Sequence, residues 1–184
     1  PCPFRLPLPL PLPLNPGVEG TFVLLDKRRG ELRGHNQSRA EQPFSPASTF
    51  KIANALIGLS LGAVRSVDEV IPYTGDANPF MPEWLQPMGL RGAMKVSNVP
   101  LYQELARRIG LQRMGEAIGR LHYGNEQIGT NVTTFWLRGP LAISANEQTR
   151  FLSALVHRSL PSPATPRSRW RRSPLRSRPW RAVQ

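Results

Sequence analysis

The feature that most limits how this chain can fold is an apolar run over residues 52–61. Its hydrophobic residues recur at helical spacing and cover a wide arc, which predicts a helix buried within its domain. Ser45 is a residue type that caps helices, Pro46 suits the first helical position, and Gly62 suits the end of a helix. We therefore expect a buried helix of about four turns between Pro46 and Gly62.

Two polar residues stand at the start of this helix. Ser48 and Lys51 are three positions apart, so a helix places them on the same face. Burial lowers the pKa of a lysine because the ammonium loses its water, and a neutral amine beside a hydroxyl can take the hydroxyl proton. The S-x-x-K pattern thus fits a serine that performs acyl transfer. On its own, the same pattern also fits an ordinary helix start with a solvated lysine.

The beginning of the chain differs from its middle. Residues 1–16 hold seven prolines, which alternate with leucine between Leu6 and Leu14. Such a run suits neither a helix nor a sheet ladder, and it lacks the continuous apolar stretch of a secretory signal peptide. We expect residues 1–19 to form an atypical segment outside the folded domain.

The end of the chain is rich in arginine, serine and proline. Residues 157–184 carry eight arginines and no acidic residue, and they supply most of the formal net charge of +12. An arginine-rich tail can bind nucleic acid through the phosphates. However, only Trp170 and Trp180 are available for base stacking, and no recognised nucleic-acid module accompanies them. We therefore expect a disordered tail that does not pack, and no nucleic-acid partner.

Composition also argues against several classes of protein. The single cysteine, Cys2, allows no internal disulfide and no cysteine-rich zinc site. We expect no metal, since the three histidines show no metal-ligand spacing: His35, His122 and His157. The chain has no run of eighteen or more apolar residues, so we expect no membrane span.

The remaining patterns predict an α+β fold. A charged turn separates two short runs, residues 20–25 and 31–35, that read as a β-hairpin. A lone hairpin is marginally stable, so the sheet must continue elsewhere, and we expect the helix after Ser48 to cover it. Ser144 and Glu147 form a capping-box pattern at the start of the last helix. The further helices are expected over residues 88–96, 100–109, 111–121 and 144–156.

Four short motifs occur in order along the chain, at residues 48–51, 97–99, 123–125 and 136–139. They read S-T-F-K, S-N-V, Y-G-N and W-L-R-G. Together they resemble the class D, oxacillinase-type serine β-lactamases. The resemblance covers residues 20–156 and implies the β-lactamase and penicillin-binding-protein fold, in which helices flank an antiparallel sheet beside a helical region.

The resemblance implies a role for each motif. Ser48 would attack the β-lactam carbonyl to give an acyl-enzyme, and its backbone N–H would supply half of an oxyanion hole. Lys51 would be the general base, and Ser97 would relay a proton to the departing lactam nitrogen. In this family the lysine amine reacts with carbon dioxide to form a carbamate, and Trp136 would donate its indole N–H to that group. No other cofactor is implied.

The carbamate needs an unprotonated amine in an apolar pocket, which Phe50, Val99 and Leu137 would help to build. Each role has a plainer alternative. Ser97 also suits capping of the helix opened by Pro100, and Trp136 also suits core filling. We read residues 123–125 as a structural turn.

The chain departs from the family in its last part. The family has a K-T-G or K-S-G strand opposite the serine and a downstream arginine for the substrate carboxylate, but no lysine follows Lys95 here. We expect the fold to be incomplete at its C-terminus, with the missing strands replaced by residues 157–184. Because one oxyanion N–H and the substrate anchor are then missing, we expect turnover to be very slow or absent.

Three other functions stay open at this point. A β-lactam sensor would carry a similar acylating module and remain acylated, an inactive fragment would do neither, and a basic interaction protein would work through the tail. The resemblance implies a β-lactam antibiotic as substrate and the periplasm as location.

Overall fold

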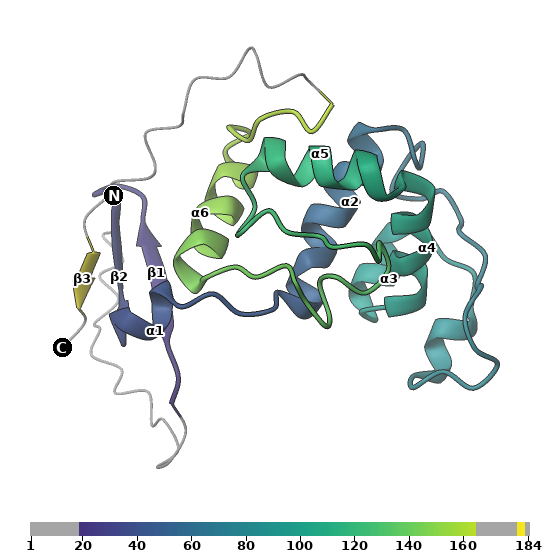
Figure 1. Cartoon of the computed structure of the whole chain (residues 1–184), viewed down its shortest axis with the longest axis horizontal. Coiled ribbons are helices and arrows are strands. Elements are labelled where there is room, and N and C mark those ends of the chain that lie inside the picture. Colours follow the sequence, from purple (N-terminus) through teal and green to yellow (C-terminus); the bar gives the residue numbers. More distant parts are fainter. Residues whose placement is uncertain (1–18, 165–179, 183–184) are drawn as a thin grey trace, which may run out of the picture.

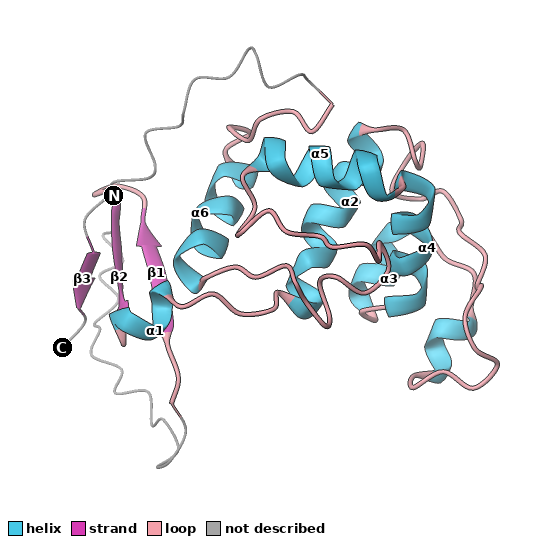
Figure 2. Cartoon of the chain, viewed as in Figure 1, coloured by secondary structure: helices cyan, strands magenta, loops and turns pink. Residues whose placement is uncertain are grey.

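The computed structural model describes residues 19–164 and 180–182, and it has the expected α+β composition. A body of helices lies on one side and a small sheet on the other, as Figures 1 and 2 show. The elements in chain order are β1 Phe22–Asp26, β2 Glu31–His35, α1 Gln37–Glu41, η1 Ala47–Thr49, α2 Phe50–Ser60, η2 Pro82–Leu85, α3 Leu90–Lys95, α4 Val99–Ile109, α5 Leu111–Leu121, α6 Ala145–Val156 and β3 Trp180–Ala182.

Helix α2 lies in the middle of the helical body, which we define as residues 47–156 (Figure 1). It packs against α4, which in turn packs against α5. The contact between α2 and α4 is close at Gly58, where an added Cβ would lie 2.8 Å from a methyl carbon of Leu105. Ile57 and Leu105 are fully buried beside it. The sequence-based expectation of a buried helix after Ser48 is therefore confirmed.

The start of this helix differs from the prediction. Residues 47–49 form a 3₁₀ turn, η1, before the α-helix begins at Phe50. Ser45 does not cap either element; its hydroxyl instead donates a hydrogen bond to the carbonyl oxygen of Trp136, 2.8 Å away. The Ser45 side chain therefore makes a hydrogen bond to a distant segment, where its residue type suggests a local helix cap.

Two other helix starts decide between alternatives left open by the sequence. Asn98, not Ser97, caps α4, because its side-chain oxygen accepts the backbone N–H of Leu101 at 3.0 Å. The capping box of α6 is confirmed: Ser144 and Glu147 each accept a backbone hydrogen bond from the other. Ser97 is thus left free of the capping role.

The hairpin forms as predicted, with Leu25 opposite Leu32 and Leu24 opposite Arg33. Its cover was predicted wrongly, since α6 packs on β1 and α2 lies inside the helical body. The other face of β1 is open, and Phe22 and Leu24 are 44% and 43% exposed. The prediction that the tail does not pack also differs from the structure at residues 180–182, which pair in parallel with β2 as β3. The rest of the tail beyond Ala164 lies outside the described residues.

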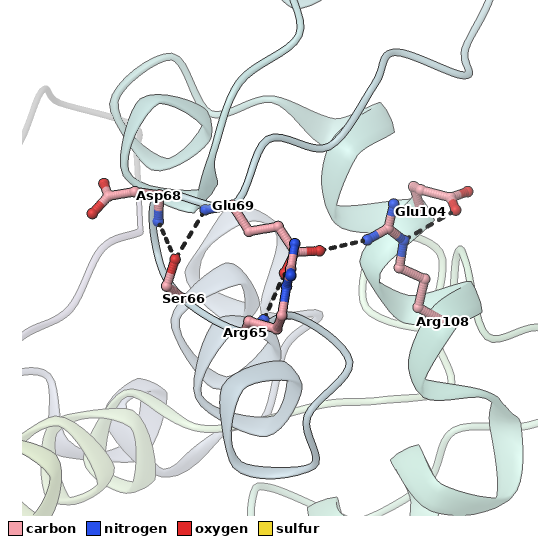
Figure 3. Close-up of polar contacts among 6 residues, drawn as sticks. All are labelled: Arg65, Ser66, Asp68, Glu69, Glu104 and Arg108. Carbon is pink, nitrogen blue, oxygen red and sulfur yellow. Dashed lines mark hydrogen bonds and ion pairs between the residues drawn. The ribbon is translucent and has the colours of Figure 1, made fainter.

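A cluster of ion pairs ties the loop after α2 to helix α4 (Figure 3). The Glu69 carboxylate accepts the backbone N–H of Arg65 at 2.7 Å and the Arg65 side chain at 3.1 Å. It also pairs with Arg108 at 3.3 Å, and Arg108 pairs with Glu104 at 3.5 Å. These hydrogen bonds, led by the Arg65 backbone N–H, hold the pKa of Glu69 below its ordinary value. The cluster lies on the surface and links the loop after α2, which holds Arg65 and Glu69, to Glu104 and Arg108 within α4.

Candidate active site

Three side chains from separate segments meet at the start of α2. The Lys51 Nζ lies 2.8 Å from the Ser48 Oγ and 3.0 Å from the Ser97 Oγ. The two hydroxyl oxygens are 3.2 Å apart, which closes a triangle of hydrogen-bonding atoms. Ser48 belongs to η1, Lys51 to the first turn of α2, and Ser97 to the turn between α3 and α4. The fold therefore brings together residues that are 46 positions apart.

The amine and the hydroxyl differ sharply in their exposure to solvent. Lys51 is 1% exposed, whereas Ser48 is exposed. Burial removes water from the ammonium and lowers the pKa of Lys51 below its ordinary value of 10.5. Within residues 19–164 no carboxylate forms an ion pair with Lys51, so no negative charge there restores its proton affinity. A neutral amine in contact with an open hydroxyl can act as its base.

Two residues of the site have backbone angles that residues other than glycine seldom adopt. Ala47 has φ 46° and Ser97 has φ 51°, both in the left-handed region. Such angles persist when surrounding contacts hold them. The Ala47 N–H donates to the Trp136 carbonyl oxygen at 2.9 Å, the same atom that accepts the Ser45 hydroxyl. The backbone of the Trp136 loop is thus fastened directly beside Ser48.

An aromatic cluster surrounds Phe50, the residue that precedes Lys51. Trp136 is fully buried, and its ring stacks on Phe50 with centroids 5.4 Å apart and an interplanar angle of 29°. Phe135 packs edge-on against Phe50 at 5.1 Å. The indole Nε1 of Trp136 is buried and has no hydrogen-bond partner within the described residues. A buried donor without an acceptor costs about 1–3 kcal/mol, so the indole N–H marks a place for an acceptor.

The Y-G-N turn holds the loop that follows this cluster. Asn125 donates from Nδ2 to the Pro140 carbonyl at 2.9 Å and accepts the Ala142 N–H at 3.1 Å. Gly124 has φ 56°, and an added Cβ would lie 2.1 Å from the Ala142 carbonyl oxygen, so a side chain does not fit there. The geometry agrees with the structural role that the sequence suggests for residues 123–125.

The remaining residues predicted to line the pocket differ in their burial. Phe50 is fully buried in the core, and Leu137 is half-buried against the same core. Val99 is half-buried at the first position of α4. Sequence reasoning missed Ser45 as a contact of the Trp136 loop, because a serine before a helix looks like a cap. It also missed Asn98, although asparagine in the middle of the S-x-V motif is itself a capping residue type.

Comparison with known proteins agrees with this geometry. Residues 20–165 match the family model of the penicillin-binding protein transpeptidase domain. The chain is 41% identical over 145 residues to β-lactamase OXA-5 of Pseudomonas aeruginosa, covering 79% of this chain and 54% of that protein. It is 44% identical over 142 residues to β-lactamase OXA-48 of Klebsiella pneumoniae, covering 77% and 53%. The chain thus spans about half the length of these relatives.

Solved structures give the same answer. The class D β-lactamase FUS-1 (OXA-85) of Fusobacterium nucleatum subsp. polymorphum superimposes with a TM-score of 0.77 at 45% identity, covering 79% of this chain and 60% of that one. A class D β-lactamase of Bacillus subtilis superimposes with a TM-score of 0.74 at 41% identity, covering 78% and 60%.

The fold, the serine and lysine pair and the family match together define the class to which this chain belongs. The chain belongs to the penicillin-binding protein transpeptidase family. The resemblance to the class D β-lactamases is confirmed by both comparisons. Within the described residues, no group of three or more metal-binding side chains exists, and no helix is long and apolar enough to cross a membrane.

Proposed function

We propose that this chain is a serine β-lactamase by descent that forms an acyl-enzyme on Ser48. The Ser48 oxygen bonds to the lactam carbonyl carbon, its proton passes to the Lys51 amine, and the ring C–N bond breaks. The Ser97 hydroxyl contacts both the Lys51 amine and the Ser48 oxygen, and it relays the proton from the amine to the departing nitrogen. The observation that carries this proposal is the 2.8 Å contact between the Ser48 hydroxyl and an amine that is 1% exposed.

We further propose that carbon dioxide modifies Lys51. A neutral amine adds to the carbon of CO₂ and releases a proton, which gives a carbamate. The residues fit such a group, because burial disfavours the protonated form of Lys51 and the buried indole N–H of Trp136 has no acceptor among the residues that the structure describes. When present, the carbamate supplies a base that can activate water against the acyl-enzyme.

Turnover is a separate matter from acylation. No lysine follows Lys95 in these 184 residues, so they contain no counterpart of the K-T-G strand that lines the site in the family. That strand region provides the second oxyanion N–H, and losing one such donor costs about 10²–10³ in rate. We propose that acylation occurs but hydrolysis of the acyl-enzyme is slow, which is also how a sensor of β-lactams would behave. A periplasmic location stays a prediction.

Intact-mass measurement after incubation with a penicillin tests the acylation step. We expect one adduct on the wild-type chain and none on Ser48→Ala. Lys51→Arg keeps a positive charge but offers no neutral amine, so its adduct should form far more slowly. Ser38→Ala, which removes a hydroxyl on α1, is the matched control and should behave as wild type. Absence of both adduct and hydrolysis would contradict acylation, and rapid hydrolysis by the pure protein would contradict slow turnover.

The carbamate can be tested because the chain has three lysines, Lys27, Lys51 and Lys95. Protein labelled with ¹³C-lysine gives three ε-carbon signals, of which Lys51→Arg identifies one. We expect the Lys51 signal to titrate at lower pH than the other two, and ¹³CO₂ to give one carbamate signal. Trp136→Phe keeps a ring but removes the N–H, and it should reduce that signal. A signal of wild-type strength in Trp136→Phe would exclude the indole as its donor.

A further inference from the structure

Trp84 holds the chain on both sides of Ser97. Trp84 belongs to η2, a short 3₁₀ helix in the long connection between α2 and α3. Its indole Nε1 donates to the carbonyl oxygen of Val96 at 3.0 Å. Its own carbonyl oxygen accepts the side-chain Nδ2–H of Asn98 at 3.3 Å. One residue thus contacts the residue before Ser97 and the residue after it.

Ser97 depends on such support more than an ordinary turn residue would. Its φ of 51° is one that a serine rarely adopts, and its hydroxyl lies within hydrogen-bonding distance of both Lys51 and Ser48. Rotation of either neighbouring peptide would move that hydroxyl away. Asn98 is 1% exposed and also caps α4, so it cannot turn to another partner without exposing the Leu101 N–H.

We propose that Trp84 is a positioning residue that fixes the Ser97 hydroxyl against Ser48 and Lys51. This inference rests on the proposed function for the part played by Ser97 in acylation. The simpler role, packing of the loop around η2, needs only the ring of Trp84. The proposed role needs its indole N–H and its contact with Asn98, and the two roles can be separated by substitution.

Two variants remove the hydrogen bonds on the two sides of Ser97. Trp84→Phe keeps an aromatic ring and deletes the bond to Val96. Asn98→Ser keeps a good capping residue for α4 but is too short to reach the Trp84 carbonyl, and it also loses the contact of Nδ2 with the Met88 sulfur at 3.8 Å. Phe80→Ala is the matched control, since Phe80 is 89% exposed and its ring lies 6.4 Å from that of Trp84. It removes an apolar ring beside Trp84 and touches neither hydrogen bond.

The experiment measures the rate of penicillin adduct formation across a range of penicillin concentrations. We expect the limiting rate to fall about tenfold or more in Trp84→Phe and in Asn98→Ser, because small displacements of reacting groups are costly. The apparent dissociation constant should stay within about twofold of wild type. Phe80→Ala should keep the wild-type limiting rate. Wild-type limiting rates in both hydrogen-bond variants would overturn the proposal.

A second readout does not require any reaction with penicillin. If Ser97 moves, water reaches the Lys51 amine, so the ¹³C-lysine signal of Lys51 should titrate at higher pH in Trp84→Phe than in wild type. If the wild-type chain is not acylated, the proposed function fails, and an unchanged Lys51 titration in the variants then overturns this inference as well. If Trp84→Phe does not fold, as judged by circular dichroism, Asn98→Ser decides by the same two measurements.

Discussion

The aromatic cluster of the helical body and the outer face of strand β1 bury their apolar side chains to different extents. In the helical body Phe50 and Trp136 are 0% exposed, whereas on β1 Phe22 and Leu24 are 44% and 43% exposed. The two hydroxyls that contact the Lys51 amine, those of Ser48 and Ser97, both belong to the helical body. The comparison teaches that the geometry of the reactive pair is maintained by helix packing. We expect substitutions on the exposed face of β1 to leave that geometry unchanged.

The largest expected effect separates two phenylalanines, one in each region. Phe50→Ala removes a ring that packs against Trp136, Phe135 and Tyr123, and we expect the free energy of unfolding to fall by about 3–5 kcal/mol. Phe22→Ala removes a half-exposed ring from β1 and should cost less than about 1 kcal/mol. Urea unfolding followed by circular dichroism measures both. Equal losses of unfolding free energy would show that the ring on β1 contributes as much to stability as the ring in the helical body.

The next effect tests the turn that holds the Trp136 loop. Gly124→Ala adds a methyl group that would clash with the Ala142 carbonyl oxygen, at a residue whose φ of 56° is strained for alanine. We therefore expect the free energy of unfolding to fall by about 2–5 kcal/mol. Gly139→Ala is the matched control, because Gly139 also has a positive φ, of 81°, but nothing lies within 4 Å of an added Cβ. It should cost about 1–2 kcal/mol. A control loss as large as that of Gly124→Ala would mean that the contact with Ala142 does not matter.

The third prediction concerns the pH dependence of stability. The pKa of Lys51 is lower in the folded chain than its ordinary value of 10.5, so the unfolded chain binds more protons between these two values. Stability should therefore rise with pH in that window, as the penalty for a buried ammonium disappears. Lys51→Met lacks the titrating group, and the wild-type-minus-variant difference in unfolding free energy should show the rise. A difference that falls with pH would mean that the folded chain favours the charged lysine.

The smallest effect is expected at the surface cluster of Figure 3. The pKa of Glu69 is lowered in the folded chain, so its contribution to stability is present above its ordinary pKa of 4.5 and is lost as the pH falls through the folded value. Glu69→Gln should lower the melting temperature slightly at pH 7 and leave it unchanged at low pH. Calorimetry measures both melting temperatures. Added salt should reduce the difference between wild type and variant, since salt screens exposed ion pairs. A large fall in melting temperature would mean that this cluster contributes substantially to the stability of the helical body.

Local patterns in the sequence were sufficient to predict most of the helices. Helix α5 begins and ends where the apolar spacing and the neighbouring glycine and turn residues indicate, and the capping box of α6 is present. The contact between Ser48 and Lys51 also follows from spacing, because both lie within one turn. Information about such features is contained in a few neighbouring residues.

Contacts between distant segments were harder to predict. Ser45 bonds to Trp136, 91 positions away, and no local pattern distinguishes this from a helix cap. The cover of the hairpin, helix α6, is far from it in sequence, as is β3, whose pairing with β2 crosses most of the chain. The family resemblance led us to place Ser97 beside Ser48 and Lys51, and the structure brings the three hydroxyl and amine groups into contact. The hydrogen bonds of Trp84 to the neighbours of Ser97 come from a loop without regular periodicity, which no local pattern predicts.

Because Ser48 is exposed and Lys51 is buried, the size of a reagent decides which of the two side chains it can reach. A bulky acylating molecule can meet the hydroxyl at the surface, but an amine that is 1% exposed admits only species as small as carbon dioxide or formaldehyde unless the fold opens. Amine-directed labels of ordinary size should therefore modify Lys27 and Lys95 and spare Lys51. The rate at which such a label does reach Lys51 would report how often this end of α2 opens.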